Sequence, residues 1–243
     1  MKKLLLSAAG VVLLGSGLGG ESPTARMPVL LELFTSEGCS SCPPADALLE
    51  KFDREQPVQG ADLIVLSEHV DYWNSLGWAD PFSSAQFSER QREYANHLRG
   101  EVYTPELVVD GAAGLVGSDE REALSTIRAA ARSEKAPIAV TAQRSGNRAK
   151  VSLHIEAPLD GVLYLAVAHD AMRSQVTRGE NAGRGLSHVA VVYSLQKVAK
   201  LDRKAGGDHD VVLYVRPGEK TRVVAFVEKS EGGRVVALGQ ARL

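Results

Sequence analysis

The pattern of apolar and polar residues changes near residue 136. Before that point, compact apolar runs suited to buried strands alternate with segments whose apolar residues recur at helical spacing. Strands are predicted at 27–34, 61–70, 106–109 and 115–116, and helices after Pro43, at 83–98 and from Ser118 to about Arg132. This alternation predicts an α/β domain over residues 27–135.

After residue 136 the pattern becomes that of short strands without helices. Apolar and polar residues alternate in segments separated by turn signals such as Gly146-Asn147 and Gly232-Gly233. The segments are 138–142, 151–155, 162–168, 189–195, 211–215, 223–227 and 235–238, and one longer connection, 172–188, interrupts the series. The series predicts an all-β, antiparallel, sandwich-like C-terminal domain over residues 137–243.

The N-terminus and the charge pattern indicate where the protein works. The basic start Met1-Lys2-Lys3, the apolar run 4–18 and the return of charge at Glu21 predict a signal peptide over residues 1–20. We expect a periplasmic or secreted protein with no membrane association after cleavage; an uncleaved anchor is the alternative, because no clear cleavage site precedes Glu21. The net charge of −2, without a later Lys/Arg-rich block, argues against a nucleic-acid partner.

Both cysteines of the chain, Cys39 and Cys42, lie in the stretch TSEGCSSCPPAD. A disulfide across so short a loop would constrain little unfolded-chain entropy, so a purely structural role is disfavoured. A metal site would need more ligands, and the six histidines are scattered singly. We therefore interpret the pair as a redox dithiol in which Cys39 is the exposed attacking thiolate and Cys42 resolves the mixed disulfide.

The order of these predicted elements, with CxxC at a helix start, resembles the thioredoxin fold over roughly residues 28–133. The resemblance implies an α/β thioredoxin-like N-terminal domain in which Pro105, after Thr104, is a cis-proline facing the dithiol and shaping the substrate groove. A plain strand-entry proline is the alternative. The chain departs from thioredoxin at Pro43-Pro44, and this weakens the helix-dipole argument if the helix begins only at Cys42.

Glu32 interrupts the apolar run VLLELF, seven residues before Cys39. Thioredoxin carries a buried Asp in the same strand, one residue nearer its first cysteine. The resemblance implies that Glu32 is buried, with a raised pKa, and accepts the proton of Cys42. A glutamate that points to solvent or forms a salt bridge is the alternative.

The stretch SEHVDYWNSLGWADPF follows the second predicted strand. His69 and Asp71 lie at its carboxyl end, where ligands sit in open α/β sheets. Trp73 and Trp78 would wall a substrate groove, or would pin an irregular loop to the core. His69 with the two cysteines would make a Cys/Cys/His copper site, a rival to the redox hypothesis, and our main expectation includes no metal.

Four stretches, ELFTSEGCSSCPPAD, HVDYWNSLGW, YTPELVVDG and RGENAGRGLSH, resemble a family of uncharacterised secreted bacterial proteins, domain-of-unknown-function family 1223. The resemblance spans nearly the whole mature chain and supports the two-part architecture. Its second-half motif matches Arg178, Asn181, Arg184 and His188. These residues would line a groove over the dithiol, or would tie down a long loop.

These observations lead to one main functional hypothesis and two rivals. The main hypothesis is a thiol–disulfide oxidoreductase enzyme that uses no cofactor beyond the Cys39–Cys42 disulfide and acts on a protein or small thiol, with an unidentified recycling redox partner. It requires that the sulfurs be accessible. The rivals are a non-catalytic thioredoxin-fold binding module whose dithiol stays oxidised, and a copper carrier using Cys39, Cys42 and His69.

Overall fold

A computed structural model gives the structure of residues 26–156, 158–202, 206–216 and 218–243, so the predicted signal peptide lies outside the described residues. Within those ranges, no helix has both the length and the apolar character to cross a membrane. In chain order the elements are β1 (Met27–Thr35), α1 (Pro43–Glu55), β2 (Ala61–His69), the 3-10 helix η1 (Asn74–Leu76), α2 (Ala85–Leu98), β3 (Glu106–Val109), β4 (Ala113–Val116), α3 (Glu120–Ala130), β5 (Ala136–Ser145), β6 (Arg148–Ile155), β7 (Gly161–Gln175), β8 (Gly185–Leu201), β9 (Gly207–Tyr214), β10 (Thr221–Glu228) and β11 (Val235–Arg242).

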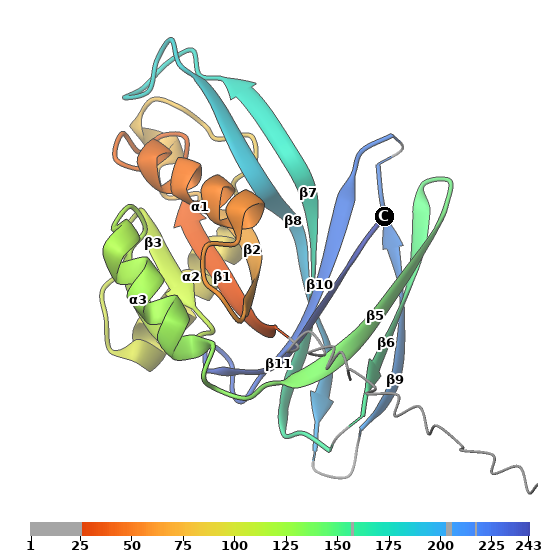
Figure 1. Ribbon diagram of the computed structural model, residues 1–243. Helices are drawn as coiled ribbons and strands as arrows, with labels where there is room; N and C mark the ends of the chain where they lie inside the picture. The colour runs from red at the N-terminus through yellow and green to blue at the C-terminus, as the bar shows by residue number, and fades with distance from the viewer. Residues whose placement is uncertain (1–25, 157, 203–205, 217) are drawn as a thin grey trace, which may run out of the picture.

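The described strands form one mixed, 11-stranded sheet in the order β4-β3-β1-β2-β8-β7-β10-β11-β5-β6-β9 (Figure 1). β1 runs parallel to β2 and antiparallel to β3. β2 and β8 pair in parallel at Ser67 and Val191, and this contact joins the two halves of the chain. The predicted α/β thioredoxin-like domain with a separate all-β sandwich-like domain is therefore wrong, because one sheet runs through both halves.

The physical reason for this error is the length of β7 and β8. The segment 172–188, expected to be a connection, instead extends both strands, which pair from Gly161–Leu201 to Gln175–Gly185. Beyond His169, residues 171–175 of β7 alternate between exposed and half-buried, so no apolar alternation marks them as strand. β8 pairs with β2 at Val191, and the hairpin continues beyond that point to Gln175 and Gly185.

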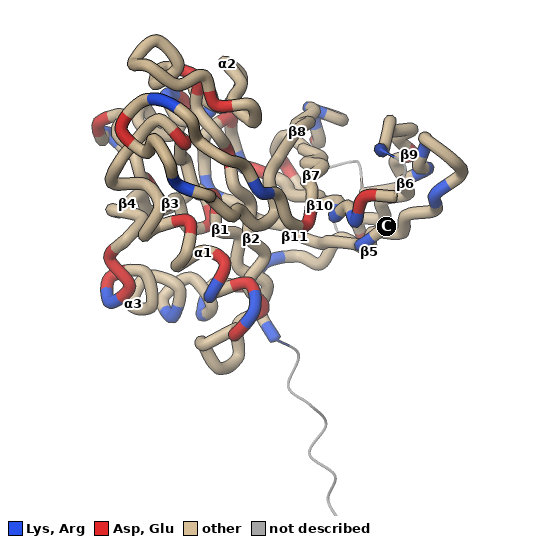
Figure 2. Tube along the Cα trace, turned by 90° about the horizontal axis from the view of Figure 1, so that it is seen from above, with Lys and Arg blue, Asp and Glu red and all other residues tan. Residues whose placement is uncertain are grey.

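The three α-helices in the described ranges cover the first half of the sheet, with α1 and α3 on one face and α2 on the other (Figure 2). α1 begins where the sequence dictates, because Pro43 and Pro44 lack the N–H groups that a first turn leaves unbonded, and Cys42 is its N-cap. Leu48, Leu49 and Phe52 form its buried face and pack into the main apolar core.

A second apolar core lies in the C-terminal half. β11 pairs with β5 only at Ala136 and Pro137 within the described residues, so the sheet turns there. Side chains from β6, such as Val151 and Leu153, share this core with side chains from β7 and β10, such as Leu165. The C-terminal half therefore has an apolar core of its own, and it also contacts the helices, since Arg222 of β10 donates to Asp53 of α1 at 2.8 Å.

Candidate functional site

The two cysteines form a disulfide in the turn between β1 and α1, with their Cα atoms 5.4 Å apart. The amide of Cys39 donates to the carbonyl oxygen of Ser36 at 3.2 Å, and the amide of Cys42 donates to the carbonyl oxygen of Cys39 at 3.2 Å. The carbonyl oxygen of Cys42 accepts from the amides of Ala45 and Asp46, in the first turn of α1. Because the helix begins at Pro43, Cys42 lies at its positive end and Cys39 lies outside it, so the helix dipole acts more weakly on Cys39, as the proline pair led us to expect.

The segment before β3 contacts the disulfide. The Thr104–Pro105 peptide bond is cis. The Sγ atom of Cys39 lies 3.9 Å from the carbonyl oxygen of Thr104, and the indole N–H of Trp73 donates to the Thr104 hydroxyl at 2.8 Å. The structure thus brings Thr104, Pro105 and Trp73, all predicted from the sequence, to the dithiol.

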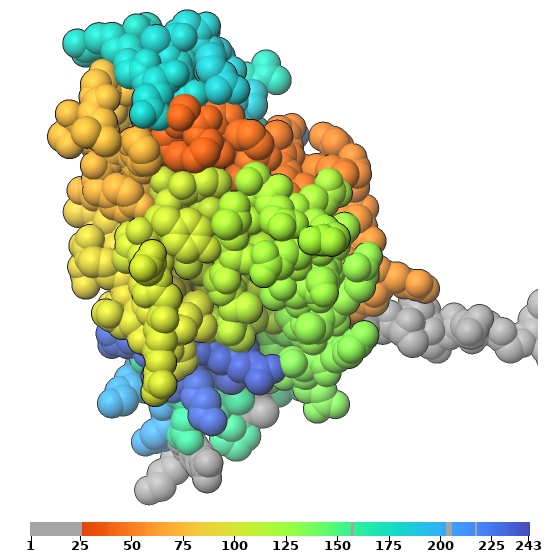
Figure 3. Space-filling view, turned by 90° about the vertical axis from the view of Figure 1, so that its left-hand side faces the viewer, coloured from red at the N-terminus to blue at the C-terminus, as the bar shows by residue number. Residues whose placement is uncertain are grey.

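Both cysteines are fully buried in this oxidised structure, whereas Ser40 and Ser41 between them are exposed. The expectation that Cys39 is exposed is therefore wrong for this state. The cover is the segment 176–184 between β7 and β8, which we call the strap; in Figure 3 this cyan region lies over the orange start of the chain.

The strap is attached to the dithiol turn by side-chain hydrogen bonds. The side-chain amide of Asn181 is buried and donates to the carbonyl oxygens of Glu37 and Cys39, both at 2.9 Å. The carboxylate of Glu180 accepts from the amide of Ser40 at 3.0 Å, and Arg184 donates to the side-chain oxygen of Asn181 at 2.8 Å. The C-terminal half therefore holds the backbone of the CxxC turn directly.

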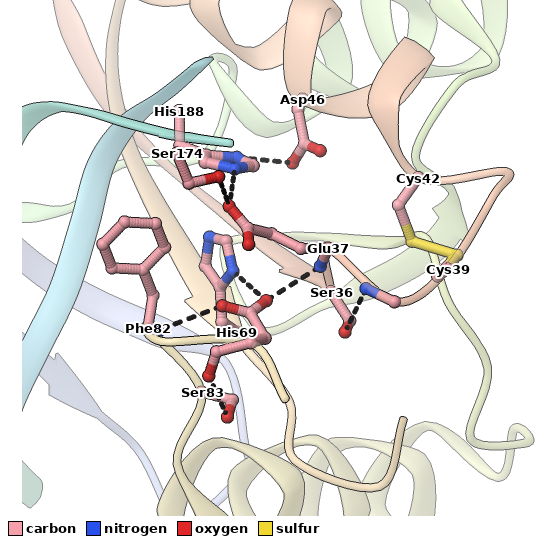
Figure 4. A network of polar contacts seen from close by, with 12 residues as sticks. Ser36, Glu37, Cys39, Cys42, Asp46, His69, Phe82, Ser83, Ser174 and His188 are labelled. Carbon is pink, nitrogen blue, oxygen red and sulfur yellow. Dashed lines mark hydrogen bonds and ion pairs between the residues drawn. A yellow bond between two sulfur atoms is a disulfide. The ribbon is translucent and has the colours of Figure 1, made fainter. Parts of the chain in front are cut away.

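A buried carboxylate, Glu37, is the centre of a polar network beside the disulfide (Figure 4). It accepts from the indole of Trp78 at 2.9 Å and from the hydroxyl of Ser174, and its Oε1 lies 3.2 Å from Nε2 of His188. Burial would raise the pKa of Glu37, but the hydrogen bonds from His188, Ser174 and Trp78 outweigh burial and lower it. Glu37 is therefore ionised at neutral pH.

His188 links Glu37 to a second carboxylate. Its Nδ1 lies 3.7 Å from Oδ1 of Asp46, a residue of α1 that is only 5% exposed. Burial alone would lower the pKa of His188, but its contacts with the carboxylates of Asp46 and Glu37 raise it to about 10. The imidazole is therefore a cation held between two carboxylates, one on each side of the CxxC motif in sequence.

A second imidazole–carboxylate pair packs against the first. Nδ1 of His69 lies 2.7 Å from Oδ2 of Asp80, which also accepts the amide of Glu37 at 2.8 Å. Burial would raise the pKa of Asp80, but the charge and hydrogen bond of His69 and two backbone amides lower it. The rings of His69 and His188 meet edge to face with centroids 4.6 Å apart. His69 is thus bonded to Asp80 through its Nδ1 atom.

Two other predicted residues, Asp71 and Arg178, do not bond to the dithiol turn. The carboxylate of Asp71 accepts from the hydroxyl of Ser88 on α2 at 2.5 Å, and Arg178 is exposed on the strap. Within the described ranges, no three His, Cys, Asp or Glu side chains are grouped as a metal ion would require.

Glu32 is buried, but the structure does not bring it to the cysteines. Its carboxylate accepts from Nε of Arg90 at 2.8 Å and from the hydroxyl of Tyr94 at 2.5 Å, on the α2 side of the sheet. Arg90 also donates to Glu228 at 2.7 Å and lies 3.6 Å from Glu68. Burial and the charge of Glu32 raise the pKa of Glu68 well above its ordinary value. Glu32 therefore belongs to a cluster that joins β1, α2 and β10.

Four residues of the site, Glu37, Asp46, Asp80 and Ser174, were not identified from the sequence. Glu37 and Asp46 lie within the cysteine motif itself, and Asp80 lies in the tryptophan-containing stretch. The signal that could have found them is the concentration of acidic residues around the motif, but nothing in the sequence shows that they are buried.

These features define a protein with a CxxC disulfide at a helix start, covered by a strap from the second half of the chain. Residues 30–228 match the family described as "Protein of unknown function (DUF1223)", and the chain belongs to this family. The search of curated proteins found no match.

Solved structures give one close likeness and weaker ones. Protein AGR_C_4864 from Agrobacterium tumefaciens has a TM-score of 0.65 and 28% sequence identity, over 90% of this chain and 94% of that chain. The sporulation control protein Spo0M from Bacillus subtilis has a TM-score of 0.32 at 8% identity, over 46% of this chain and 49% of that chain. A hypothetical protein, PH1083, from Pyrococcus horikoshii has a TM-score of 0.27 at 11% identity, over 46% and 90%.

Proposed function

We propose that this protein is a thiol–disulfide oxidoreductase that acts outside the cytoplasm through the Cys39–Cys42 couple. The observation that carries the proposal is the placement of both sulfurs, within bonding reach, at the start of α1. The positive end of the helix dipole favours a thiolate there, although Pro43 and Pro44 supply no N–H groups. Proteins with an accessible disulfide and small thiols are the substrate classes that fit this chemistry.

The reaction exchanges one disulfide for another. In the reduced protein, the thiolate of Cys39 attacks a substrate disulfide, forms a mixed disulfide and releases the first substrate thiol. The thiolate of Cys42 then attacks Sγ of Cys39, restores the intramolecular disulfide and releases the second substrate thiol. A dithiol partner of the same chemical class must return two electrons and two protons for the next cycle.

Burial of the sulfurs means that access requires movement of the strap. The bonds from Asn181 and to Glu180 that hold the CxxC turn must open for a substrate sulfur to approach Cys39 in line. The strap is exposed except at its anchors, Val176 and Asn181, and it contains Gly179 and Gly183 at positive φ. Few apolar contacts would therefore be lost when it lifts.

The complete burial of both cysteines favours a second candidate function. In that case the disulfide stays oxidised and fixes the turn that presents Ser40 and Ser41, and the protein is a non-catalytic binding module. The two candidates differ in whether the native protein exchanges its disulfide at all.

Reduction of insulin in the presence of dithiothreitol separates them. We expect cysteine-dependent turnover by the wild-type protein, none by Cys39→Ser, and a trapped mixed disulfide with Cys42→Ser that mass spectrometry detects. His154→Gln, which changes an exposed residue of β6, is the control. A wild-type protein that stays oxidised and shows no turnover would favour the binding module.

A further inference from the structure

The proposed exchange requires a proton acceptor inside the protein. When Cys42 resolves a mixed disulfide, its thiol must lose a proton, and Cys42 is fully buried. Burial disfavours an isolated thiolate and disfavours direct proton transfer to water. Glu32 is bonded to Arg90 and Tyr94, so its acceptor positions are already used.

Asp46 lies where such an acceptor is needed. Cys42 has helical dihedral angles (φ −76°, ψ −39°), and the amide of Asp46 donates to its carbonyl oxygen at 3.1 Å. Residues four apart in this geometry share one helix face, with their Cβ atoms about 5–6 Å apart. The side chains of Cys42 and Asp46 therefore leave the backbone on one helix face, one turn apart, with the Asp46 carboxylate turned toward His188 (Figure 4).

The carboxylate of Asp46 is also incompletely bonded. Among the described residues, no group donates a hydrogen bond to its Oδ1, although Asp46 is only 5% exposed. A buried carboxylate oxygen without a donor is uncommon in folded proteins, and a catalytic role is one explanation for such an atom. Its neighbour is Nδ1 of His188 at 3.7 Å, too far for a hydrogen bond.

His188 does not itself accept the proton of Cys42, because its second ring nitrogen is held by Glu37. Its Nε2 lies 3.2 Å from Glu37, which is held by Trp78 and Ser174. The remaining ionisable groups packed here, His69 and Asp80, are paired with each other at 2.7 Å. His188 thus presents a fixed positive charge to Asp46 from β8.

We propose that Asp46 accepts the proton of Cys42 during resolution of the mixed disulfide, and that His188 positions Asp46 and balances its charge. This inference rests on the proposed function. As the Cys42 sulfur bonds to Sγ of Cys39, the bond between Cys39 and the substrate sulfur breaks. The proton moves from Cys42 to Asp46 and then to the departing substrate thiolate, so protons and electrons balance. The second half of the chain contributes to the acid–base chemistry through His188.

The first test measures the resolution rate as a function of pH. We expect Asp46→Asn to slow release of the second thiol from a preformed mixed disulfide with glutathione about 100-fold near neutral pH. The defect should disappear at alkaline pH, where Cys42 ionises without help. Asp46→Glu should restore part of the rate, and His188→Gln should give an intermediate defect. His154→Gln, which removes an exposed histidine paired with Asp208 at 2.7 Å, is the matched control. Wild-type rates for Asp46→Asn at every pH would overturn the inference while the proposed function stands.

A second measurement needs no turnover. In the Cys39→Ser background, the thiolate absorbance of Cys42 is titrated with and without Asp46→Asn. Loss of the neighbouring negative charge should increase the acid dissociation constant of Cys42 about tenfold or more. An unchanged titration would overturn the role of Asp46, even if the wild-type protein forms no mixed disulfide and the proposed function fails.

Discussion

Asn181→Ala is the most direct test of the strap as a gate over the disulfide. The side chain donates two hydrogen bonds to buried carbonyl oxygens of the CxxC turn. Each bond contributes about 0.5–1.5 kcal/mol net, so their removal weakens the closed strap by about 1–3 kcal/mol. Since 1.4 kcal/mol is a factor of ten in an equilibrium constant, the open population should rise about 5- to 150-fold. If only the open form reacts, the rate of disulfide reduction rises by the same factor.

The assay follows reduction of the native protein by excess tris(2-carboxyethyl)phosphine at 25 °C, with alkylation and mass measurement of the released thiols. Arg178→Ala, on the same strap but exposed, serves as control and should reduce at the wild-type rate. Thermal unfolding of each variant shows whether global stability has changed. Equal reduction rates for Asn181→Ala and wild type, with folding intact, would refute the reasoning, because the reductant would then reach the sulfurs without strap opening.

Three further predictions concern the pH dependence and the stability of the fold. His188→Gln should lower the free energy of unfolding most at acidic pH. The pKa of His188 in the folded protein, about 10, exceeds its ordinary value of 6.5, so the stabilisation by His188 is complete below about pH 6.5 and is lost as pH rises through about 10. Urea unfolding at several pH values measures this dependence. Arg90→Met should cost about 3–5 kcal/mol in urea unfolding, because it leaves buried carboxylates without their cation. Gly111→Ala should cost at least about 1–3 kcal/mol in thermal unfolding, since φ is +59° there and a Cβ atom would lie 2.3 Å from the carbonyl oxygen of Gly233.

Local signals in the sequence were sufficient to predict the individual strands and helices of the first half of the chain. The apolar run before Thr35 predicts a strand because β1 is buried on both faces, and the proline pair at 43–44 predicts the start of α1. The strand and the helix start depend only on neighbours in sequence. The approach of Thr104 to Cys39, 65 residues away, was instead implied by the resemblance to the thioredoxin fold, and the structure agrees.

The joining of the two halves could not be predicted in the same way. It depends on β2 and β8, whose pairing involves Ser67 and Val191, more than 120 residues apart by their numbers. The polar outer part of the β7–β8 hairpin shows no apolar alternation, so the full length of these two strands cannot be predicted from the sequence. A single sequence therefore indicates an α/β pattern followed by an all-β pattern, but it does not indicate that one sheet contains both.

Glu32 and Glu37 show why burial alone does not assign a role. Both glutamates are fully buried, five residues apart, yet Glu32 bonds to Arg90 of α2 and Glu37 bonds to His188 of β8. Their partners lie 58 and 151 residues away in sequence. The sequence could predict an acidic group near the dithiol, but only the distant partners determine which one lies there.

The pairing of β8 with β2 has a consequence for how this chain can be divided. A polypeptide that stopped at residue 135 would leave one side of β2 without its neighbour, and open strands of that kind recruit other chains. Such a fragment would also lack the groups that neutralise Glu37. Recombination or gene shortening near the middle of this sequence would therefore tend to yield aggregates, and the two parts are expected to be inherited as one unit.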